Sequence, residues 1–336
     1  MGFVDDVIMG EPGSSKIDIS ALVIDLSEQL PDPQPIVRIW GNLIASRGNV
    51  STVVGLAKSR KTFLTAAVAS GFLSSSDFLG FDPPATGKVV YIDTEQARAH
   101  VHKVARRILR SIGLPTDHNH DKLVVAALRE LTPDQRREAT GEILRRYKPD
   151  LLILDGVADL CNDPNDLHES EALTCELMRW SSEYDNHILC VLHSNPGGEK
   201  ARGHLGSALL RKSETVMLVK ADGDTSVVSP QYCRNEPFTE FAFQINASGL
   251  PELCGIPAPQ PKENVFAEIM EAGKVYAHSE LIEMLMEAVD LKEGSAKSKI
   301  SRAVKAGTIV KNQAGGYYLP GSQTEVSQPE LHDEPF

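Results

Sequence analysis

One short stretch constrains the fold of this chain more than any other feature. The apolar run Ser51–Val54 leads into a polar loop, and a helical pattern follows over Phe63–Phe72. The loop has the spacing GxxxxxK[ST], which places backbone N–H groups and a helix N-terminus around one point, as a polyphosphate requires. The residues expected to bind the phosphates are Gly55, Leu56, Ala57, Lys58, Ser59, Arg60, Lys61 and Thr62. The stretch therefore predicts an α/β fold with a nucleotide at the end of a strand.

Two residues of this loop have separate expected roles, and a third departs from the usual pattern. Lys61 is expected to reach the β- and γ-phosphates, and Thr62 to hold Mg²⁺. Arg60 stands where glycine is usual, and a side chain there can crowd the phosphates or strain the backbone. A degenerate loop, or a chance Gly–Lys–Thr spacing, is the alternative.

Polar residues follow three further apolar runs in the order that a nucleotide site needs. Glu95 follows the run Lys88–Asp93, Asp155 ends the run Leu151–Asp155, and His193 ends the run Ile188–His193. Ligands of open α/β sheets bind at the carboxyl ends of strands. Glu95 is expected to orient the attacking water, Asp155 to contact Mg²⁺ through water as a Walker B residue, and His193 to sense the γ-phosphate. The alternatives are a helix N-terminal acid, a turn aspartate and a histidine that caps a strand.

The pattern around these motifs predicts the domain organisation. Short apolar runs alternate with amphipathic segments over residues 36–248, which is typical of an α/β domain with a mainly parallel sheet. We expect an acidic N-terminal arm (1–35), this core (36–248), a Pro- and Gly-rich linker (249–262), a winged helix (263–320) and a disordered tail (321–336).

Composition excludes several classes of protein. The chain has 336 residues and a net charge of −12, so a protein that coats nucleic acid with its whole surface is disfavoured. Its five cysteines show no zinc-ligand spacing, which favours free thiols in a reducing compartment. The segment Met1–Gly10 has no basic region, and the longest uncharged run, Thr62–Ser76, is too short and polar to span a bilayer. We therefore expect a cytoplasmic protein without a membrane partner.

Two basic segments are candidates for nucleic-acid contact. The Gly-rich loop after His193 carries Lys200 and Arg202, and a mobile basic loop at this position could bind the phosphates of a DNA backbone. Residues 291–320 contain six basic residues and one acid, and the predicted helix 294–306 presents Lys297, Lys299 and Arg302. The alternatives are a solvated surface loop and a winged helix that contacts only protein.

With these motifs in order, residues 36–248 resemble the RecA-like P-loop ATPase superfamily, nearest the plasmid RepA-type and DnaB-type hexameric helicases. LILDGVADL is similar to the Walker B segment of recombinase-type ATPases, and GSALLRKSETVMLVK (206–220) to the family's segment after the mobile loop. Arg234 lies where such helicases have a K-x-R pair. The resemblance implies that Arg234 enters the neighbouring subunit's ATP site, and hence a homo-oligomer, expected to be a hexamer. Tyr232 replaces the family lysine, so half of that pair is lost.

The sequence thus predicts an ATPase that uses ATP and Mg²⁺ and acts on DNA, as a RepA-like replication helicase or a related mobile-element ATPase. We expect single-stranded DNA at the core, with duplex DNA possible at the winged helix. A nucleotide-binding regulatory or scaffold protein with little turnover is the main alternative, because Arg60 and Tyr232 depart from the family pattern. A metabolic kinase is weaker, since nothing resembles an acceptor-substrate lid. The sequence leaves the choice between ATP and GTP open.

Overall fold

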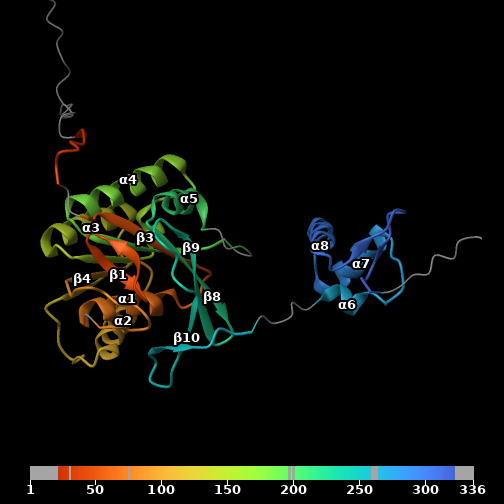
Figure 1. Ribbon diagram of the computed structural model, residues 1–336, viewed down its shortest axis with the longest axis horizontal. Coiled ribbons are helices and arrows are strands. Elements are labelled where there is room, and N and C mark those ends of the chain that lie inside the picture. The colour runs from red at the N-terminus through yellow and green to blue at the C-terminus, as the bar shows by residue number, and fades with distance from the viewer. Residues whose placement is uncertain are drawn as a thin grey trace, which may run out of the picture. The chain divides into compact units, whose positions relative to one another are not determined.

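The computed structural model describes residues 22–29, 32–74, 76–195, 198, 201–258 and 264–321. The chain divides into two compact units, Met1–Ile256 and Pro257–Phe336, which we describe separately (Figure 1). Most of the predicted N-terminal arm, nearly all of the predicted tail, and Lys200 lie outside the described residues.

The first unit is built on a nine-stranded sheet in the order β11-β10-β9-β8-β3-β7-β6-β4-β5. The strands from β8 to β5 in this order are parallel, and β9, β10 and β11 continue the sheet in antiparallel fashion. The strands are β3 (Asn49–Gly55), β4 (Val89–Asp93), β5 (Leu123–Ala127), β6 (Leu151–Asp155), β7 (His187–His193), β8 (Thr215–Asp222), β9 (Thr225–Cys233), β10 (Phe241–Ile245) and β11 (Pro251–Cys254). This mainly parallel sheet confirms the predicted α/β fold class.

Helices cover both faces of the sheet (Figure 1). One face packs against α1 (Lys61–Ser74), α2 (Arg98–Ser111) and a hairpin of β1 (Pro35–Ile39) and β2 (Asn42–Ser46). The other face packs against α3 (Pro133–Tyr147), the 3₁₀ helix η2 (Val157–Leu160), α4 (Leu167–Glu183) and α5 (Gly203–Lys212). The central strands read as continuous apolar runs because both of their faces are covered.

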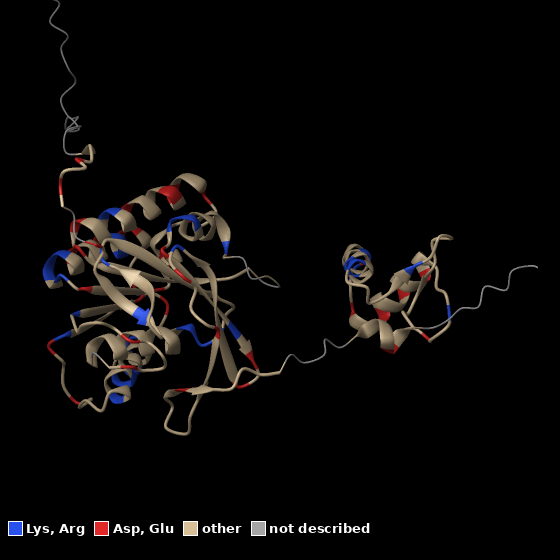
Figure 2. Cartoon of the chain, viewed as in Figure 1, with Lys and Arg blue, Asp and Glu red and all other residues tan. Residues whose placement is uncertain are grey.

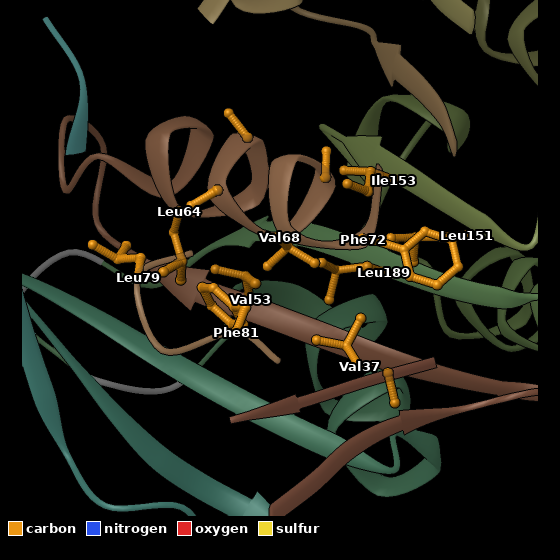
Figure 3. Close-up of a cluster of buried hydrophobic side chains, with 14 of the residues drawn as sticks. Val37, Val53, Leu64, Val68, Phe72, Leu79, Phe81, Leu151, Ile153 and Leu189 are labelled. Carbon is orange, nitrogen blue, oxygen red and sulfur yellow. The ribbon is translucent and has the colours of Figure 1, made fainter. Parts of the chain in front are cut away.

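Helix α1 is the centre of the first core and carries the phosphate loop at its N-terminus. Its small and apolar residues are buried around almost its whole circumference, because the sheet, helix α2 and strand β1 all pack against it. Figure 3 shows Val68 and Phe72 of α1 among Val53, Leu189 and Val37 of the neighbouring strands. Each such side chain contributes about 1.5–3 kcal/mol on burial, so this packing fixes the position of the loop.

Several strands were not predicted from the sequence. The predicted arm ends one residue too late, because β1 begins at Pro35. The segment predicted as a linker contains β11, whose Pro251 is tolerated as the first residue of an edge strand. Strand β9 was missed because its polar sequence includes Pro230, which lies beside a register shift in the pairing with β8.

The second unit contains three helices and a small hairpin around its own apolar core. The elements are α6 (Val265–Ile269), α7 (His278–Val289), α8 (Glu293–Lys305), β12 (Val310–Lys311) and β13 (Tyr317–Tyr318). Tyr276 also forms a bridge with Tyr317. This is the predicted order of elements, and the assignment as a winged helix stays a prediction. Among the helices of the described residues, none has both the length and the apolar character needed to cross a bilayer.

Candidate active site

Four adjacent strands bring the predicted site residues to one edge of the sheet. Gly55 at the end of β3 pairs with His193 at the end of β7, and Asp155 at the end of β6 pairs with Asp93 at the end of β4. A cavity of about 490 Å³ opens there. Its lining includes the loop residues Lys58–Phe63 together with Glu95, Asp155 and His193. The structure thus assembles residues that are up to 138 positions apart in the sequence.

The phosphate loop has a tight, strained backbone. A Cβ atom on Gly55 would collide with the carbonyl oxygen of Val219 and the hydroxyl of Ser59, so only glycine fits. Lys58 and Arg60 have φ values of 65° and 67°, in the left-handed region that favours glycine. Helix α1 starts directly after this turn, so its N-terminus lies at the cavity.

The Arg60 side chain does not block the loop, although glycine is usual at its position. Its guanidinium group turns to the β8–β9 turn, where it donates hydrogen bonds to the carbonyl oxygens of Gly223 (3.0 Å) and Thr225 (3.2 Å). It also donates to the hydroxyl of Ser226 at 3.2 Å. The crowding that this residue type suggests is therefore avoided by the direction of the side chain.

The Lys61 side chain folds back onto the backbone of its own phosphate loop. Its Nζ atom donates hydrogen bonds to the carbonyl oxygens of Gly55 and Leu56, both at 2.9 Å. Burial lowers the pKa of the Lys61 amine, while the charges of Asp155 and Glu95 act in the opposite direction. A bound phosphate would offer this ammonium group anionic acceptors in place of two carbonyl oxygens.

Asp155 is buried and receives two hydroxyl donors on one oxygen. Thr62 Oγ1 donates to its Oδ2 atom at 2.8 Å, and the Tyr91 hydroxyl donates to the same atom at 2.7 Å. Burial raises the pKa of Asp155, although both hydrogen bonds lower it. Burial, with the charge of Asp155, also raises the pKa of Tyr91 well above its usual value. The tyrosine therefore stays a hydroxyl donor at neutral pH.

The donor set at Thr62 and Asp155 fits Mg²⁺. A hydroxyl and a carboxylate are oxygen ligands of the kind that this ion prefers, and Mg²⁺ commonly takes the rest from phosphates and water. Within the described part of the chain, no group of three or more His, Cys, Asp or Glu residues forms a metal cage. Thr62 and Asp155 would supply the protein's ligands to an ion that also binds the phosphates of a nucleotide.

His193 connects Lys61 to Glu95. Its Nδ1 atom lies 3.2 Å from Lys61 Nζ, and its Nε2 atom lies 3.3 Å from Glu95 Oε1. A lysine ammonium group only donates and a carboxylate only accepts, so Nδ1 is the acceptor and Nε2 carries the proton. The hydrogen bond from His193 is the largest cause that lowers the pKa of Glu95 despite its partial burial, and the charge of Lys61 acts in the same direction.

The backbone around Glu95 is fixed by its own strand end. The Asp93 carboxylate accepts hydrogen bonds from the backbone N–H groups of Glu95 (3.0 Å) and Gln96 (2.7 Å). About half of the Glu95 side chain (47%) remains exposed. An ionised, half-exposed carboxylate held beside the phosphate loop can orient a water molecule for attack.

Sequence reasoning missed one wall of the cavity. His100, Lys103 and Arg107 of α2 line it, and Arg107 stacks on the Phe63 ring at 3.7 Å from the ring centroid. Burial lowers the pKa of Arg107, whose Nε atom is buried and has no hydrogen-bond partner among the described residues. The spacing of three and four residues between these basic side chains was the signal that could have found this helix face.

Arg234, the arginine expected to enter a neighbouring subunit's site, lies away from its own cavity, as the pairing of β8 shows. Thr215 pairs with Cys233 at the amino end of β8, whereas Val219 pairs with Gly55 at the loop. Arg234 follows Cys233, so it lies at the opposite edge of the sheet from its own phosphate loop, where its Nη2 atom donates to the Lys212 carbonyl oxygen at 2.9 Å.

The predicted DNA-binding residues lie outside the cavity as well. Arg202 is exposed, and its backbone N–H donates to the His193 carbonyl oxygen at 3.0 Å. Lys297, Lys299 and Arg302 belong to α8 of the second unit, where basic residues gather in Figure 2.

A protein-family model matches part of this chain. A search of curated proteins finds no match to this chain. A family model described as "AAA domain" matches residues 15–199, which is more than half of the chain. The match includes the phosphate loop, Glu95, Asp155 and His193, and it ends before α5. The chain therefore belongs to the AAA domain family and is a P-loop ATPase of this type.

Proposed function

We propose that this protein is an oligomeric ATPase that acts on DNA, of the type of a RepA-like replication helicase or a related mobile-element ATPase. The observation that carries the proposal is the contact chain from Lys61 through His193 to Glu95. This chain joins the residue that would hold the phosphates to the residue that would orient the attacking water. A site built only to bind nucleotide has no need of the second residue.

The residues of the cavity suggest how hydrolysis would proceed. Lys61 leaves the Gly55 and Leu56 carbonyl oxygens to bind the β- and γ-phosphates, and the amides of the loop surround them. Bound Mg²⁺ would neutralise part of the phosphate charge. The Glu95 carboxylate accepts a hydrogen bond from a water molecule and aligns it with the γ-phosphorus. His193 holds Glu95 in place and, through Nδ1, responds to the position of Lys61.

The opposite edge of the sheet would complete a neighbouring site. Arg234 is exposed and lies at the edge away from its own loop, so it serves catalysis only if it enters the cavity of another subunit. There it would stabilise charge on the transferred phosphoryl group. The proposed oligomer is a homo-oligomeric ring, with a hexamer as the expected form.

Two features support action on DNA. Arg202, in the loop after β7, donates its backbone N–H to the His193 carbonyl oxygen. A movement of His193 on phosphate binding would therefore be passed directly to this basic loop. Helix α8 buries Ala296, Ile300 and Ala303 and leaves Lys297 and Arg302 exposed, with Lys299 half-buried. This is how a helix packs inward and presents cations to a DNA backbone.

The test is the rate of ATP hydrolysis with and without single-stranded DNA, together with strand separation on a forked duplex. We expect stimulation by single strands and unwinding by the intact chain, with Lys61→Ala as the inactive control. Hydrolysis that DNA does not change, without unwinding, would remove the DNA-acting part of the proposal.

A nucleotide-operated switch is the second candidate. It is favoured by two departures from the family pattern, Arg60 in place of glycine in the phosphate loop and Tyr232 in place of the lysine before Arg234, because both affect residues expected to support hydrolysis. This protein would bind ATP and change its assembly or DNA affinity with negligible phosphate release. Calorimetry of ATP binding, combined with a phosphate-release assay, distinguishes it from the motor.

A further inference from the structure

The turn between β8 and β9 is attached to the phosphate loop through one side chain. Arg60 donates to the carbonyl oxygens of Gly223 and Thr225 and to the Ser226 hydroxyl, at 3.0–3.2 Å. The carboxylate of Asp224 lies 3.9 Å from the same guanidinium group. The planar guanidinium group is suited to several acceptors at once, so this attachment is directional.

A second, buried bond joins the same two segments. The Ser226 hydroxyl donates to the carbonyl oxygen of Ser59 at 3.2 Å, and both residues are buried. Two consecutive loop residues are therefore held by the first residues of β9. A shift of the loop backbone at this point must either move β9 or break these bonds.

Arg60 holds this attachment with a backbone conformation, φ of 67°, that favours glycine. A non-glycine residue is less stable than glycine in the left-handed region, because its Cβ atom comes too close to the following carbonyl oxygen. Lys58 has the same kind of strain in the same loop, with φ at 65°, but its side chain is exposed. The strain at Arg60 is thus offset by hydrogen bonds to another element of the fold.

The other end of β9 leads to Arg234. Strand β9 pairs with β8 from Thr225 to Cys233, a span of roughly 30 Å. Beyond it, the Arg234 backbone N–H donates to the carbonyl oxygen of Glu214 at 2.9 Å. One strand therefore begins at the chain's own phosphate loop and ends at the arginine assigned above to a neighbouring site.

We propose that Arg60 is a positioning residue that couples the phosphate loop to β9, so that nucleotide in one site changes the position of β9 and Arg234. The inference rests on the proposed function, because it requires a nucleotide in this loop. Lys61 must leave the Gly55 and Leu56 carbonyl oxygens to reach a phosphate. Arg60 precedes it directly, and its carbonyl oxygen accepts the first amide hydrogen bonds of α1, so the movement reaches Arg60 and then the hairpin.

The test is amide hydrogen exchange of β9 with and without a non-hydrolysable ATP analogue, a measurement that needs neither turnover nor DNA. In the wild-type chain, we expect the analogue to change exchange at the β9 amides by about fivefold or more, the lower range of measured couplings between sites. Arg60→Gly should bind the analogue, because glycine takes this backbone conformation without strain, but lose the change in β9.

Lys148→Gly is the control, because it relieves the same kind of backbone strain, at the left-handed end of α3, without changing the phosphate loop or the link. It should keep the β9 response to the analogue. Ser226→Ala removes the hydroxyl that contacts both Arg60 and Ser59, so it should weaken the response from the hairpin side. A response in Arg60→Gly equal to that of the wild type would overturn the coupling.

The coupling and the proposed function fail in different ways. If calorimetry finds no binding of the analogue to the wild-type chain, both are wrong. If the analogue binds and exchange in β9 stays unchanged, only the coupling is wrong.

Discussion

The Nδ1 atom of His193 lies 3.2 Å from the Nζ atom of Lys61, while the opposite ring nitrogen faces Glu95. The imidazole ring therefore contacts both residues, so a movement of the Lys61 amine changes the hydrogen bonding of the ring. When Lys61 turns to a phosphate, Nδ1 loses its donor and the hydrogen bond to Glu95 is free to change. The same residue accepts the Arg202 amide through its carbonyl oxygen, so Lys61, Glu95 and the loop after β7 all contact one histidine.

Glu95→Gln should keep ATP bound and stop its hydrolysis. The amide preserves size and position but cannot accept a proton, and general base catalysis is worth about 10²–10⁴-fold. Equilibrium binding and phosphate release measured on the same preparation check this. Lys61→Ala, which should lose binding itself, is the comparison, and turnover by Glu95→Gln at the wild-type rate would show that another group orients the water.

His193→Ala should move the acid limb of the rate profile to higher pH. The hydrogen bond from His193 is the largest cause of the lowered pKa of Glu95, so its removal returns that pKa toward the usual glutamate range. Glu95 then protonates at a higher pH and activity is lost sooner as pH falls. The pH dependence of kcat measures this shift, and an unchanged acid limb would assign it to a different group.

Asp155→Asn should stabilise the nucleotide-free protein at neutral pH while it impairs Mg²⁺-dependent hydrolysis. Burial raises the pKa of Asp155, so the folded chain binds this proton more tightly than the unfolded chain. The free energy of unfolding therefore falls as pH rises through that pKa, and the ionised form costs stability at pH 7. The asparagine carbonyl can still accept from Thr62 and Tyr91.

Thermal unfolding at pH 7 and at acid pH tests this expectation. The gain in midpoint should shrink as Asp155 becomes protonated in the wild type. Asp121→Asn, at an exposed aspartate, is the control and should leave the midpoint nearly unchanged. A lower midpoint for Asp155→Asn at pH 7 would mean that the buried charge stabilises the site.

Arg234→Ala should retain ATP binding and lose hydrolysis by about 10³-fold or more, as expected for an arginine that acts between subunits. Arg179→Ala, at an exposed arginine of α4, is the matched control. Equal mixtures of the Arg234→Ala and Glu95→Gln chains are the sharper experiment. The Arg234→Ala chain keeps Glu95, and the Glu95→Gln chain keeps Arg234. A site is complete only where the first chain's Glu95 meets the second chain's Arg234, which should happen at about a quarter of randomly formed interfaces. No recovery on mixing would count against action in trans.

Charge reversal at Lys297, Lys299 and Arg302 should weaken DNA binding and flatten its dependence on salt. Each phosphate that is no longer neutralised lowers the magnitude of the slope of log K against log salt by about 0.7–0.9. Titrations at several salt concentrations measure the slope, with Lys274→Glu of the same unit as control. An unchanged slope would favour a module that contacts protein.

The sequence alone determined the elements that carry chemistry. The spacing of Gly55, Lys61 and Thr62, and the strand-terminal positions of Asp155 and His193, followed from local patterns. Parallel strands place their carboxyl ends at one edge, so the assembly of these residues was predictable once the strands were recognised. Continuous apolar runs made that recognition possible.

Only the tertiary structure decided what the local pattern left ambiguous. The sequence shows an arginine at position 60, but whether its side chain crowds the phosphates depends on an acceptor turn more than 160 residues away. Tyr91 and Arg107 join the site because β4 and α2 pack against α1, which no spacing within one segment reveals. The polar, proline-containing β9 forms because β8 and β10 pair with it, and backbone hydrogen bonds with neighbours outweigh weak intrinsic strand propensity.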